Sequence, residues 1–329
     1  MLRKKWWMPA LVALSLGPSG CWAGDYENHP GSQAFIERMV AEHGFDKAEL
    51  NAVLAQAERK QSIIDAMTRP AEKVKPWKDY RLIFIQEKRI DEGADFWRKH
   101  RETLEDVSAK YGVDPAIIVA IIGVETFYGR ITGSYRVLDA LSTLAFDYPK
   151  RSPFFTKELE NFLLLSREQN QDPTVLKGSY AGAMGYGQFM PSSYRHYAVD
   201  YDGDEFVDIW NNPKDAIASV ANYFVRHGWK AGEPVVARAT AADGYSNDML
   251  NKLKKPETTL DAFRASGLRV QGDFSPERKA FPMKLLAESG EEYWLGFDNF
   301  YAITRYNHSH RYAMAVYQLS ELIRERVGE

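Results

Sequence analysis

Apolar positions recur every three to four residues along most of the chain, a spacing that predicts amphipathic helices. In the first third, a helix is expected over 33–43, ending at Gly44, and Asp46-Lys47-Ala48-Glu49 has the form of a capping box that opens the next helix. Asp114-Pro115 supplies an N-cap and first-turn signal for a later helix. Further helical patterns cover 91–111, 153–167, 192–198, 215–227 and 309–327.

The pattern changes after Pro234, where short apolar runs stand between turn-rich pieces. These runs predict strands over 235–239, 281–286, 293–297 and 300–304. The last segment returns to helical spacing. The sequence therefore predicts a mainly α protein of the α+β class, with a small β-containing module before its final helix.

The N-terminus has the three parts of a secretory signal. Residues 3–5 are basic, 6–16 are apolar, and 17–20 contain small residues and a proline. The apolar part is too short to span a bilayer, so we expect 1–23 to be a signal peptide and the mature protein to be exported. A basic, proline-bounded linker is expected over 69–76.

The chain has one cysteine, Cys21, which excludes an internal disulfide. Two interpretations stay open. Ser19-Gly20-Cys21 has the form of a lipobox end, in which Cys21 is lipidated and anchors the protein to the outer membrane. Alternatively, Cys21-Trp22-Ala23 supports ordinary cleavage before Gly24 and a soluble protein. Either processing route leads to the bacterial periplasm.

Composition narrows the function classes. The 42 basic and 45 acidic residues give 329 residues a net charge of −3, which argues against a nucleic-acid partner because such a binding face needs a basic excess. The aromatic content is high, at 13%. Most of these rings are expected in the core, but clefts that bind sugars also need aromatic faces.

Glu125 is the first candidate for chemistry. It closes the run 117–124, which is apolar on every helical face and is therefore expected to be buried all round. Partial burial raises the pKa of a carboxyl group and suits it to act as a general acid. The alternative is that the helix emerges into solvent there and Glu125 is an ordinary surface acid.

A second candidate is the glycine-rich segment 178–191. Its four glycines allow close backbone approach to a ligand, and it carries Ser179, Tyr186, Gln188 and Phe189. The alternative is a tightly packed loop without a ligand.

A third candidate is an acidic loop in which carboxylates occupy positions 1, 3 and 5 of an EF-hand pattern: Asp200, Asp202 and Asp204. The backbone carbonyl of Phe206 stands at position 7. Two departures matter, because position 6 is Glu205 where glycine is usual and position 12 is Asn211. Asp215 is available to close a longer loop. The alternative is a solvated acidic turn.

Five motifs in one order resemble the membrane-bound lytic murein transglycosylase B family: 122–126, 178–194, the acidic loop, 219–224 and 304–309. The resemblance covers the chain from about Tyr80 to the last helix. It implies a lysozyme-like helical core with an N-terminal α domain and a small β module. The corresponding domains are 24–75, then 76–230 plus 305–329 as the catalytic core with its calcium loop, and 231–304 as the β-containing module.

The resemblance also assigns roles to residues. Glu125 corresponds to the family's single catalytic acid–base. The expected glycan-binding residues are Tyr80, Arg151, Ser179, Gln188, Phe189, Tyr223, Tyr306, Asn307 and Tyr312. The expected ligands of a structural Ca²⁺ are Asp200, Asp202, Asp204, Phe206 and Asp215, although the loop is one residue longer than the family's at Asn211-Asn212. No organic cofactor is expected.

The implied reaction cleaves the β-1,4 bond between N-acetylmuramic acid (MurNAc) and N-acetylglucosamine (GlcNAc) in peptidoglycan and forms 1,6-anhydro-MurNAc. Glycosidases normally need two carboxylates. The other candidates, Asp139, Asp147 and Glu158, lie in ordinary helix or turn contexts, so the substrate is expected to supply the rest. Two alternatives stay open: a muramidase of the same fold, and a non-catalytic peptidoglycan-binding scaffold. Expected partners are glycan strands and cell-wall synthesis proteins, with the protein itself a monomer.

Overall fold

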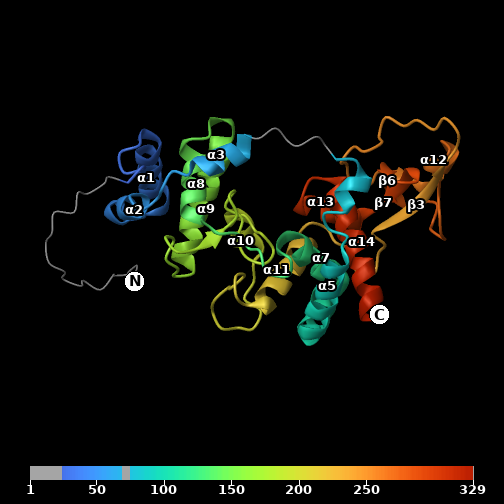
Figure 1. The fold of residues 1–329 in the computed structure, drawn as a ribbon, viewed down its shortest axis with the longest axis horizontal. Helices are drawn as coiled ribbons and strands as arrows, with labels where there is room; N and C mark the ends of the chain where they lie inside the picture. Colours follow the sequence, from blue (N-terminus) through green and yellow to red (C-terminus); the bar gives the residue numbers. More distant parts are fainter. Residues whose placement is uncertain (1–23, 69–74, 329) are drawn as a thin grey trace. The chain divides into compact units, whose positions relative to one another are not determined.

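The structure is a computed structural model that describes residues 24–68 and 75–328 (Figure 1). The predicted signal peptide, with Cys21, and most of the predicted linker 69–76 lie outside the described residues. The fold divides into two compact units: unit 1 is Met1–Pro70 with Thr132–Asn211, and unit 2 is Ala71–Ile131 with Asn212–Glu329. The domain boundaries expected from the sequence stay a prediction, because compact units need not be independently folding domains.

Unit 1 is built almost entirely of helices, with one short two-stranded ladder. Its elements are α1 (Pro30–His43), α2 (Lys47–Leu54), α3 (Gln61–Thr68), β1 (Tyr135–Arg136), α8 (Val137–Phe146), η1 (Pro149–Arg151), α9 (Ser152–Glu168), β2 (Lys177–Gly178) and α10 (Pro191–Tyr197). The predicted caps are confirmed: α1 ends at Gly44 with φ 63°, and Asp46 accepts hydrogen bonds from the amides of Ala48 and Glu49. Helices α8 and α9 lie side by side and bury leucine-rich faces against each other (Figure 1).

Unit 2 combines a helical bundle with a small sheet. Its elements are α4 (Trp77–Arg81), α5 (Glu87–Lys99), α6 (Arg101–Tyr111), α7 (Pro115–Thr126), α11 (Pro213–Arg226), β3 (Val236–Ala241), β4 (Thr258–Thr259), α12 (Leu260–Ala265), β5 (Leu268–Val270), β6 (Lys279–Ala287), β7 (Gly290–Gly296), α13 (Asp298–Tyr306) and α14 (His310–Val327). Helix α7 is the centre of the bundle, with α5, α11 and α14 packed against it. The expected buried run is confirmed, since every residue from Ala116 to Val124 is buried.

The sheet of unit 2 has the strand order β4-β6-β7-β3-β5, and all neighbours are antiparallel. Strands β6 and β7 form a hairpin that pairs from Phe281 with Gly296 to Ala287 with Gly290. Helix α12 contributes Leu260 and Phe263 to the apolar core of this module. The predicted small β-containing module is therefore present before the final helix.

Two predicted elements differ from the structure. The predicted strand 300–304 is wrong, because these residues lie in α13, whose buried positions Phe300, Ile303 and Thr304 follow helical spacing. Aromatic and branched residues in a short run hid that period. The predicted helical stretch 91–111 is two helices, α5 and α6, separated at His100, where the backbone leaves helical geometry with φ −115° and ψ 23°.

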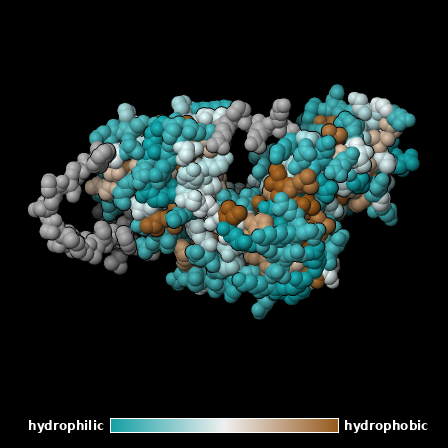
Figure 2. Space-filling model, in the orientation of Figure 1, coloured by the Kyte–Doolittle hydropathy of each residue, from teal (hydrophilic) through white to brown (hydrophobic). Residues whose placement is uncertain are grey.

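Within the described residues, no single helix has the length and apolar character of a membrane span, although the sharply bent pair α6 and α7 passes that test jointly. The face shown in Figure 2 is mostly hydrophilic, with smaller hydrophobic patches. Exposed apolar side chains in unit 2 include Leu82 and Ile83, which follow α4.

Candidate active site and acidic loop

Glu125 lies in the last turn of α7. Asp114 begins the helix by accepting a hydrogen bond from the Ala116 amide at 2.9 Å, and Pro115 occupies the first turn. The helix ends because Phe127 and Tyr128 both adopt left-handed backbone conformations, with φ 52° and 61°. Two consecutive non-glycine residues in this region are uncommon and are held by their surroundings. The carboxyl of Glu125 therefore stands at a rigid helix end.

Tyr128 fixes that helix end between α5 and α7. Its hydroxyl donates a hydrogen bond to the Arg89 carbonyl at 2.7 Å. A Cβ atom at Gly93 or Gly123 would come within 2.5 or 2.6 Å of the Tyr128 hydroxyl oxygen, so both positions need glycine for this ring to fit. No residue pattern in the sequence singles out Tyr128, because its role depends on contacts between separate helices.

The Glu125 carboxyl is partly buried, and burial raises its pKa to about 7, against a smaller lowering by the Tyr312 hydrogen bond. The Tyr312 hydroxyl donates to Glu125 Oε1 at 2.5 Å. Burial and the charge of Glu125 raise the pKa of Tyr312 well above its usual value, so the phenol stays a neutral donor. The expectation of a partly desolvated carboxyl at the end of a buried helix is confirmed, and the surface-acid alternative is wrong.

Three tyrosines, Tyr80, Tyr306 and Tyr312, lie close enough to this carboxyl to be influenced by its charge, and a fourth packs against Tyr306. The charge of Glu125 also contributes to raising the pKa of Tyr80 and of Tyr306, although burial is the larger cause for both. The Tyr306 ring lies against Tyr223, with centroids 4.7 Å apart, and the Tyr223 hydroxyl donates to the Arg305 carbonyl at 2.6 Å. We call Tyr80, Tyr223, Tyr306 and Tyr312 the tyrosine group. It brings apolar ring faces and hydroxyls to one carboxyl, which suits a sugar ligand.

Asn307 ends α13 directly after Tyr306 and is exposed. Six of the ten predicted catalytic and glycan-binding residues thus belong to unit 2. The remaining four, Arg151, Ser179, Gln188 and Phe189, belong to unit 1.

Segment 178–191 of unit 1 is held by its own hydrogen bonds. Ser179 Oγ accepts from the amides of Ala181 and Ala183 at 3.3 and 3.0 Å. Gln188, with φ 50°, donates through Nε2 to the carbonyls of Thr132 and Gly185, both at 3.1 Å. These bonds leave the Ser179 hydroxyl proton and Gln188 Oε1 as groups for a ligand.

Close packing explains two glycines of this segment, because a side chain there would collide with a neighbouring backbone carbonyl. A Cβ at Gly178 would lie 2.3 Å from the Ala183 carbonyl oxygen, and one at Gly185, where φ is 68°, would lie 2.4 Å from the Ile209 carbonyl oxygen. Phe189 is buried, at 3% exposure, while Arg151 is exposed with its guanidinium 4.4 Å from the Phe154 ring centroid. The segment is thus a tightly packed loop, and its ligand role rests on the polar groups named above.

The other carboxylates considered as a second acid have structural partners in unit 1. Glu158 accepts from the Ser192 amide at 2.9 Å and from its hydroxyl at 2.7 Å, at the start of α10. Asp139 pairs with Arg136 at 2.8 Å, and Asp147 accepts from the Tyr26 hydroxyl at 2.6 Å. These carboxylates hold helices in place.

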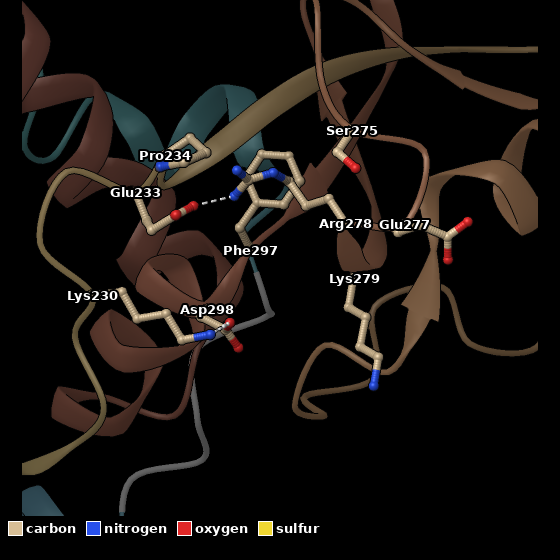
Figure 3. A pocket seen from close by; sticks show the side chains of 9 residues that line it. All are labelled: Lys230, Glu233, Pro234, Ser275, Glu277, Arg278, Lys279, Phe297 and Asp298. Carbon is tan, nitrogen blue, oxygen red and sulfur yellow. Dashed lines mark hydrogen bonds and ion pairs between the residues drawn. The ribbon is translucent and has the colours of Figure 1, made fainter.

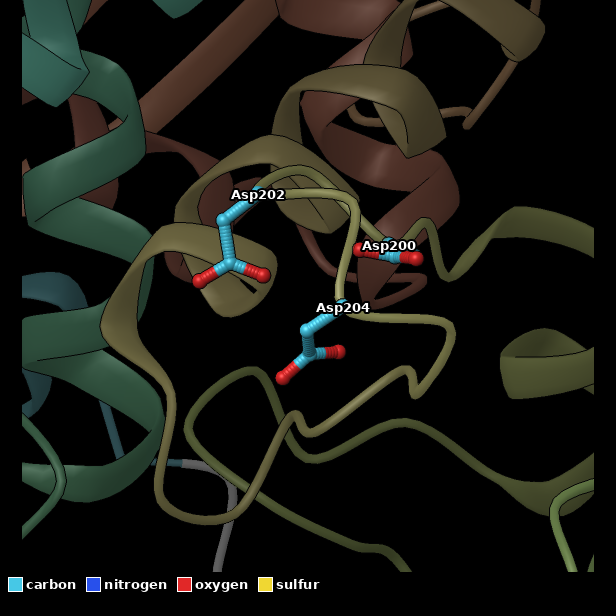
Figure 4. Close-up of side chains that lie close together, drawn as sticks. All are labelled: Asp200, Asp202 and Asp204. Carbon is cyan, nitrogen blue, oxygen red and sulfur yellow. The ribbon is translucent and has the colours of Figure 1, made fainter.

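The acidic loop brings three carboxylates together (Figure 4). One oxygen each from Asp200, Asp202 and Asp204 lies within 4.8 Å of the others. Asp200 also accepts from the amides of Gly203 and Glu205 at 2.7 and 2.9 Å, which folds the loop around its first ligand position. Glu205 has φ 69°, so it adopts the left-handed turn that glycine usually makes at position 6.

Asp215, the predicted closing ligand, is fully buried in the first turn of α11 and belongs to unit 2. The hard oxygen donors of the three loop aspartates fit a calcium ion. The full ligand set predicted from the sequence stays a prediction.

Comparisons of the sequence with protein families and with individual known proteins agree on one family. A family model described as a transglycosylase SLT domain matches residues 27–321. The chain is 46% identical over 309 residues to the membrane-bound lytic murein transglycosylase B of Escherichia coli (strain K12), covering 91% of this chain and 84% of that protein.

Solved structures of related proteins share the fold of this chain. The soluble lytic transglycosylase SltB1 of Pseudomonas aeruginosa is 53% identical, with a TM-score of 0.88 over 91% of this chain and 100% of that one. Escherichia coli Slt35 in complex with calcium is 44% identical, with a TM-score of 0.86 over 93% and 96%. Pseudomonas aeruginosa SltB3 in complex with NAG-anhNAM-pentapeptide is 30% identical, with a TM-score of 0.80 over 89% and 78%.

Proposed function

Since this chain belongs to the transglycosylase SLT family and is a lytic murein transglycosylase with a lysozyme-like fold, we propose that Glu125 alone supplies its acid–base chemistry. The bond broken is the β-1,4 link between MurNAc and GlcNAc, and the product carries 1,6-anhydro-MurNAc. The observation that carries the proposal is the partly buried Glu125, with its pKa near 7 and its Oε1 held by Tyr312.

The first step is protonation of the bridging oxygen. Because Oε1 accepts the Tyr312 hydrogen bond, the proton of the acid form is placed on Oε2, where it can be given to the substrate. A pKa of about 7 keeps a large fraction of Glu125 protonated at neutral pH without making it a poor donor. The bond between muramoyl C1 and the bridging oxygen then breaks, and GlcNAc leaves with the proton.

The second step closes the ring. The muramoyl 2-acetamido group stabilises the positive charge on C1 while the ionised Glu125 removes the proton from the muramoyl 6-hydroxyl. That oxygen forms the new bond to C1. Glu125 is protonated again at the end, and no water is consumed.

The tyrosine group supports this chemistry by excluding water and stacking on sugar faces. Each of Tyr306 and Tyr312 keeps its proton because burial raises its pKa, so neither phenol competes with Glu125 for the role of base. Ser179, Gln188, Phe189 and Arg151 are proposed to bind the same glycan strand. Support for a peptidoglycan ligand comes from SltB3, whose structure holds NAG-anhNAM-pentapeptide.

The acidic loop is proposed to bind calcium through Asp200, Asp202 and Asp204, with the carbonyl of Phe206 and with Asp215 as further ligands. Support comes from the clustered carboxylates, the left-handed Glu205 and the calcium complex of Slt35. The ion would neutralise three like charges and stabilise the loop. It supplies no step of the reaction.

The location is proposed to be the periplasm, either soluble or associated with the outer membrane through a lipidated Cys21. The relative from Escherichia coli is named membrane-bound, which supports the second option. Mass spectrometry of the mature N-terminus separates the two: a diacylglyceryl Cys21 indicates an anchor, and a terminus at Gly24 indicates a soluble enzyme.

The experiment that tests the function is digestion of purified sacculi followed by borohydride reduction and mass spectrometry. Products that end in 1,6-anhydro-MurNAc have no reducing end and keep their mass on reduction. Muropeptides that gain two hydrogens on reduction, as the main product, would make this a muramidase. No solubilised product would favour the scaffold alternative.

A further inference from the structure

One cavity of unit 2 is lined by basic side chains. It has a volume of about 490 Å³, and among the described residues its wall includes Lys75, Lys284, His308, His310 and Arg311 but no carboxylate. By contrast, three carboxylates line the cavity of about 360 Å³ in Figure 3, and two of them form ion pairs: Glu233 with Arg278 and Asp298 with Lys230. We call the cavity of about 490 Å³ the basic cavity.

The positive charge of the basic cavity is only partly compensated. Lys284 forms an ion pair with Glu291, at 2.8 Å. Among the residues that the structure describes, no carboxylate of the cavity wall pairs with Lys75 or Arg311; the Arg311 guanidinium donates to the carbonyl of Lys75. Exposed lysines flank the wall residue Leu253 on both sides, at Lys252 and Lys254. An anionic ligand would be attracted here.

The basic cavity also offers hydrogen bonding. His310 Nε2 is buried without a hydrogen-bond partner among the residues that the structure describes. Burial lowers the pKa of His310 to about 4, so its ring is neutral at physiological pH and contributes a polar contact without adding charge. A buried polar atom of this kind is normally satisfied by a ligand or water.

The basic cavity borders the tyrosine group. The Arg311 guanidinium lies 5.2 Å from the centroid of the Tyr80 ring. The next residue along α14, Tyr312, donates a hydrogen bond to the Glu125 carboxyl. A substituent on the muramoyl sugar at Glu125 would therefore lie near the cavity, and in peptidoglycan that substituent is a short peptide with several carboxylates.

We propose that the basic cavity binds the carboxylates of the stem peptide on MurNAc and so makes the enzyme prefer peptide-bearing over naked glycan. The inference rests on the proposed function for the identity of the sugar, but the cavity's charge and size stand independently. A volume near 490 Å³ lies within the range of small-ligand sites and admits part of a peptide.

The test compares sacculi with the same glycan after an amidase has removed its peptides. Lys75→Glu reverses one uncompensated charge and leaves the carbonyl that Arg311 uses, and Lys284→Met removes a second charge with little change in length. Lys279→Glu, an exposed position in the other cavity, is the matched control. Each cavity variant should lower kcat/KM on peptide-bearing sacculi roughly fivefold and leave kcat/KM on naked glycan unchanged.

A binding measurement separates this inference from the function itself. The peptides released by the amidase are titrated into Glu125→Gln, with and without Lys75→Glu, so that no turnover is needed. Weaker peptide binding in the double variant, and weaker wild-type binding at high salt, are expected. Equal loss of activity on both substrates, no loss on either, or unchanged peptide binding would overturn the proposal. Binding of anionic lipid vesicles that Lys75→Glu abolishes, without any change on sacculi, would assign the cavity to a membrane surface instead.

Discussion

The molecule places carboxylates in two opposite environments. In unit 2, Glu125 is a single, partly buried carboxyl whose pKa rises to about 7. In unit 1, Asp202 and Asp204 are exposed and lie with Asp200 as three carboxylates on one loop. Desolvation favours the neutral form of an acid, whereas a group of exposed carboxylates presents oxygens to a cation. Burial, more than residue type, is therefore expected to decide whether an acidic side chain transfers a proton or binds a metal ion.

The local backbone reinforces this difference. Glu125 lies in the last turn of the buried helix α7. Tyr128, directly after that helix, bonds to the Arg89 carbonyl of α5, and Tyr312 of α14 bonds to the carboxyl itself. The acidic loop is fixed by its own short-range bonds from Asp200 to Gly203 and Glu205. Substitutions at the Glu125 site are therefore expected to lower the rate of turnover, and substitutions in the acidic loop are expected to lower the stability of the fold.

The largest expected effect is on turnover by Glu125→Gln. The amide has nearly the same shape but cannot donate and retake a proton, so kcat on sacculi should fall by at least about 10²–10⁴. Glu288→Gln, at an exposed position, is the matched control and should keep full activity. A folded Glu125→Gln protein that digests sacculi at the wild-type rate would remove Glu125 from its role.

The same substitution should stabilise the protein at high pH. Because the folded-state pKa of Glu125 is raised, from 4.5 to about 7, wild type loses stability as the pH rises through that window. Glu125→Gln escapes this loss, which is at most about 3 kcal/mol. Denaturant unfolding of both proteins from about pH 4 to pH 8 measures it. An unchanging difference in unfolding free energy across this range would mean that Glu125 titrates normally.

Calcium removal should act on the second region and on stability alone. An ion bound only to the folded state stabilises it by about 2.7 kcal/mol at a hundredfold excess over its Kd. EDTA should therefore lower Tm, and calcium should restore it better than magnesium. Asp202→Asn should abolish this response, whereas Asp273→Asn, an exposed aspartate of unit 2, should keep it. If EDTA leaves the Tm of the wild-type protein unchanged, the loop is a solvated acidic turn and not a calcium site.

The smallest effect is expected from Tyr312→Phe. The hydrogen bond from Tyr312 lowers the pKa of Glu125, so its loss should raise that pKa further. The alkaline limb of the activity profile, expected near pH 7 in wild type from the pKa of Glu125, should move to higher pH, with kcat reduced several-fold. Tyr317→Phe on the same helix is the control and should leave the limb in place. A limb that stays fixed in Tyr312→Phe would assign Tyr312 to packing alone.

Much of the Glu125 region could be predicted from the sequence because its signals are local. The Asp114-Pro115 start and the unbroken apolar run locate α7, and the carboxyl at its end follows directly. The tertiary part could not be predicted from residue patterns: nothing in the sequence brings Tyr128 to Gly93, or Tyr312 to Glu125. The resemblance to a known family supplied Tyr312, and Tyr128 was missed.

Short elements were the harder part of the fold. The segment 300–304 has two aromatic residues and two branched side chains in a run too short to show a period, so a helix was mistaken for a strand. The basic cavity was also missed, since its wall combines Lys75, residues of β6 and the start of α14, which are distant in the sequence. Charge at such a site becomes visible only when the chain is folded.

The central claim, that bond breaking at Glu125 consumes no water, is tested most directly by digesting sacculi in ¹⁸O-labelled water. The tethered 6-hydroxyl has a large effective concentration relative to water, and exclusion of water from the Glu125 site would protect the cation from hydrolysis. Mass spectrometry should therefore find muropeptides that end in unlabelled 1,6-anhydro-MurNAc. Reducing ends that carry the heavy isotope, as the main product, would contradict the claim and make the enzyme a hydrolase.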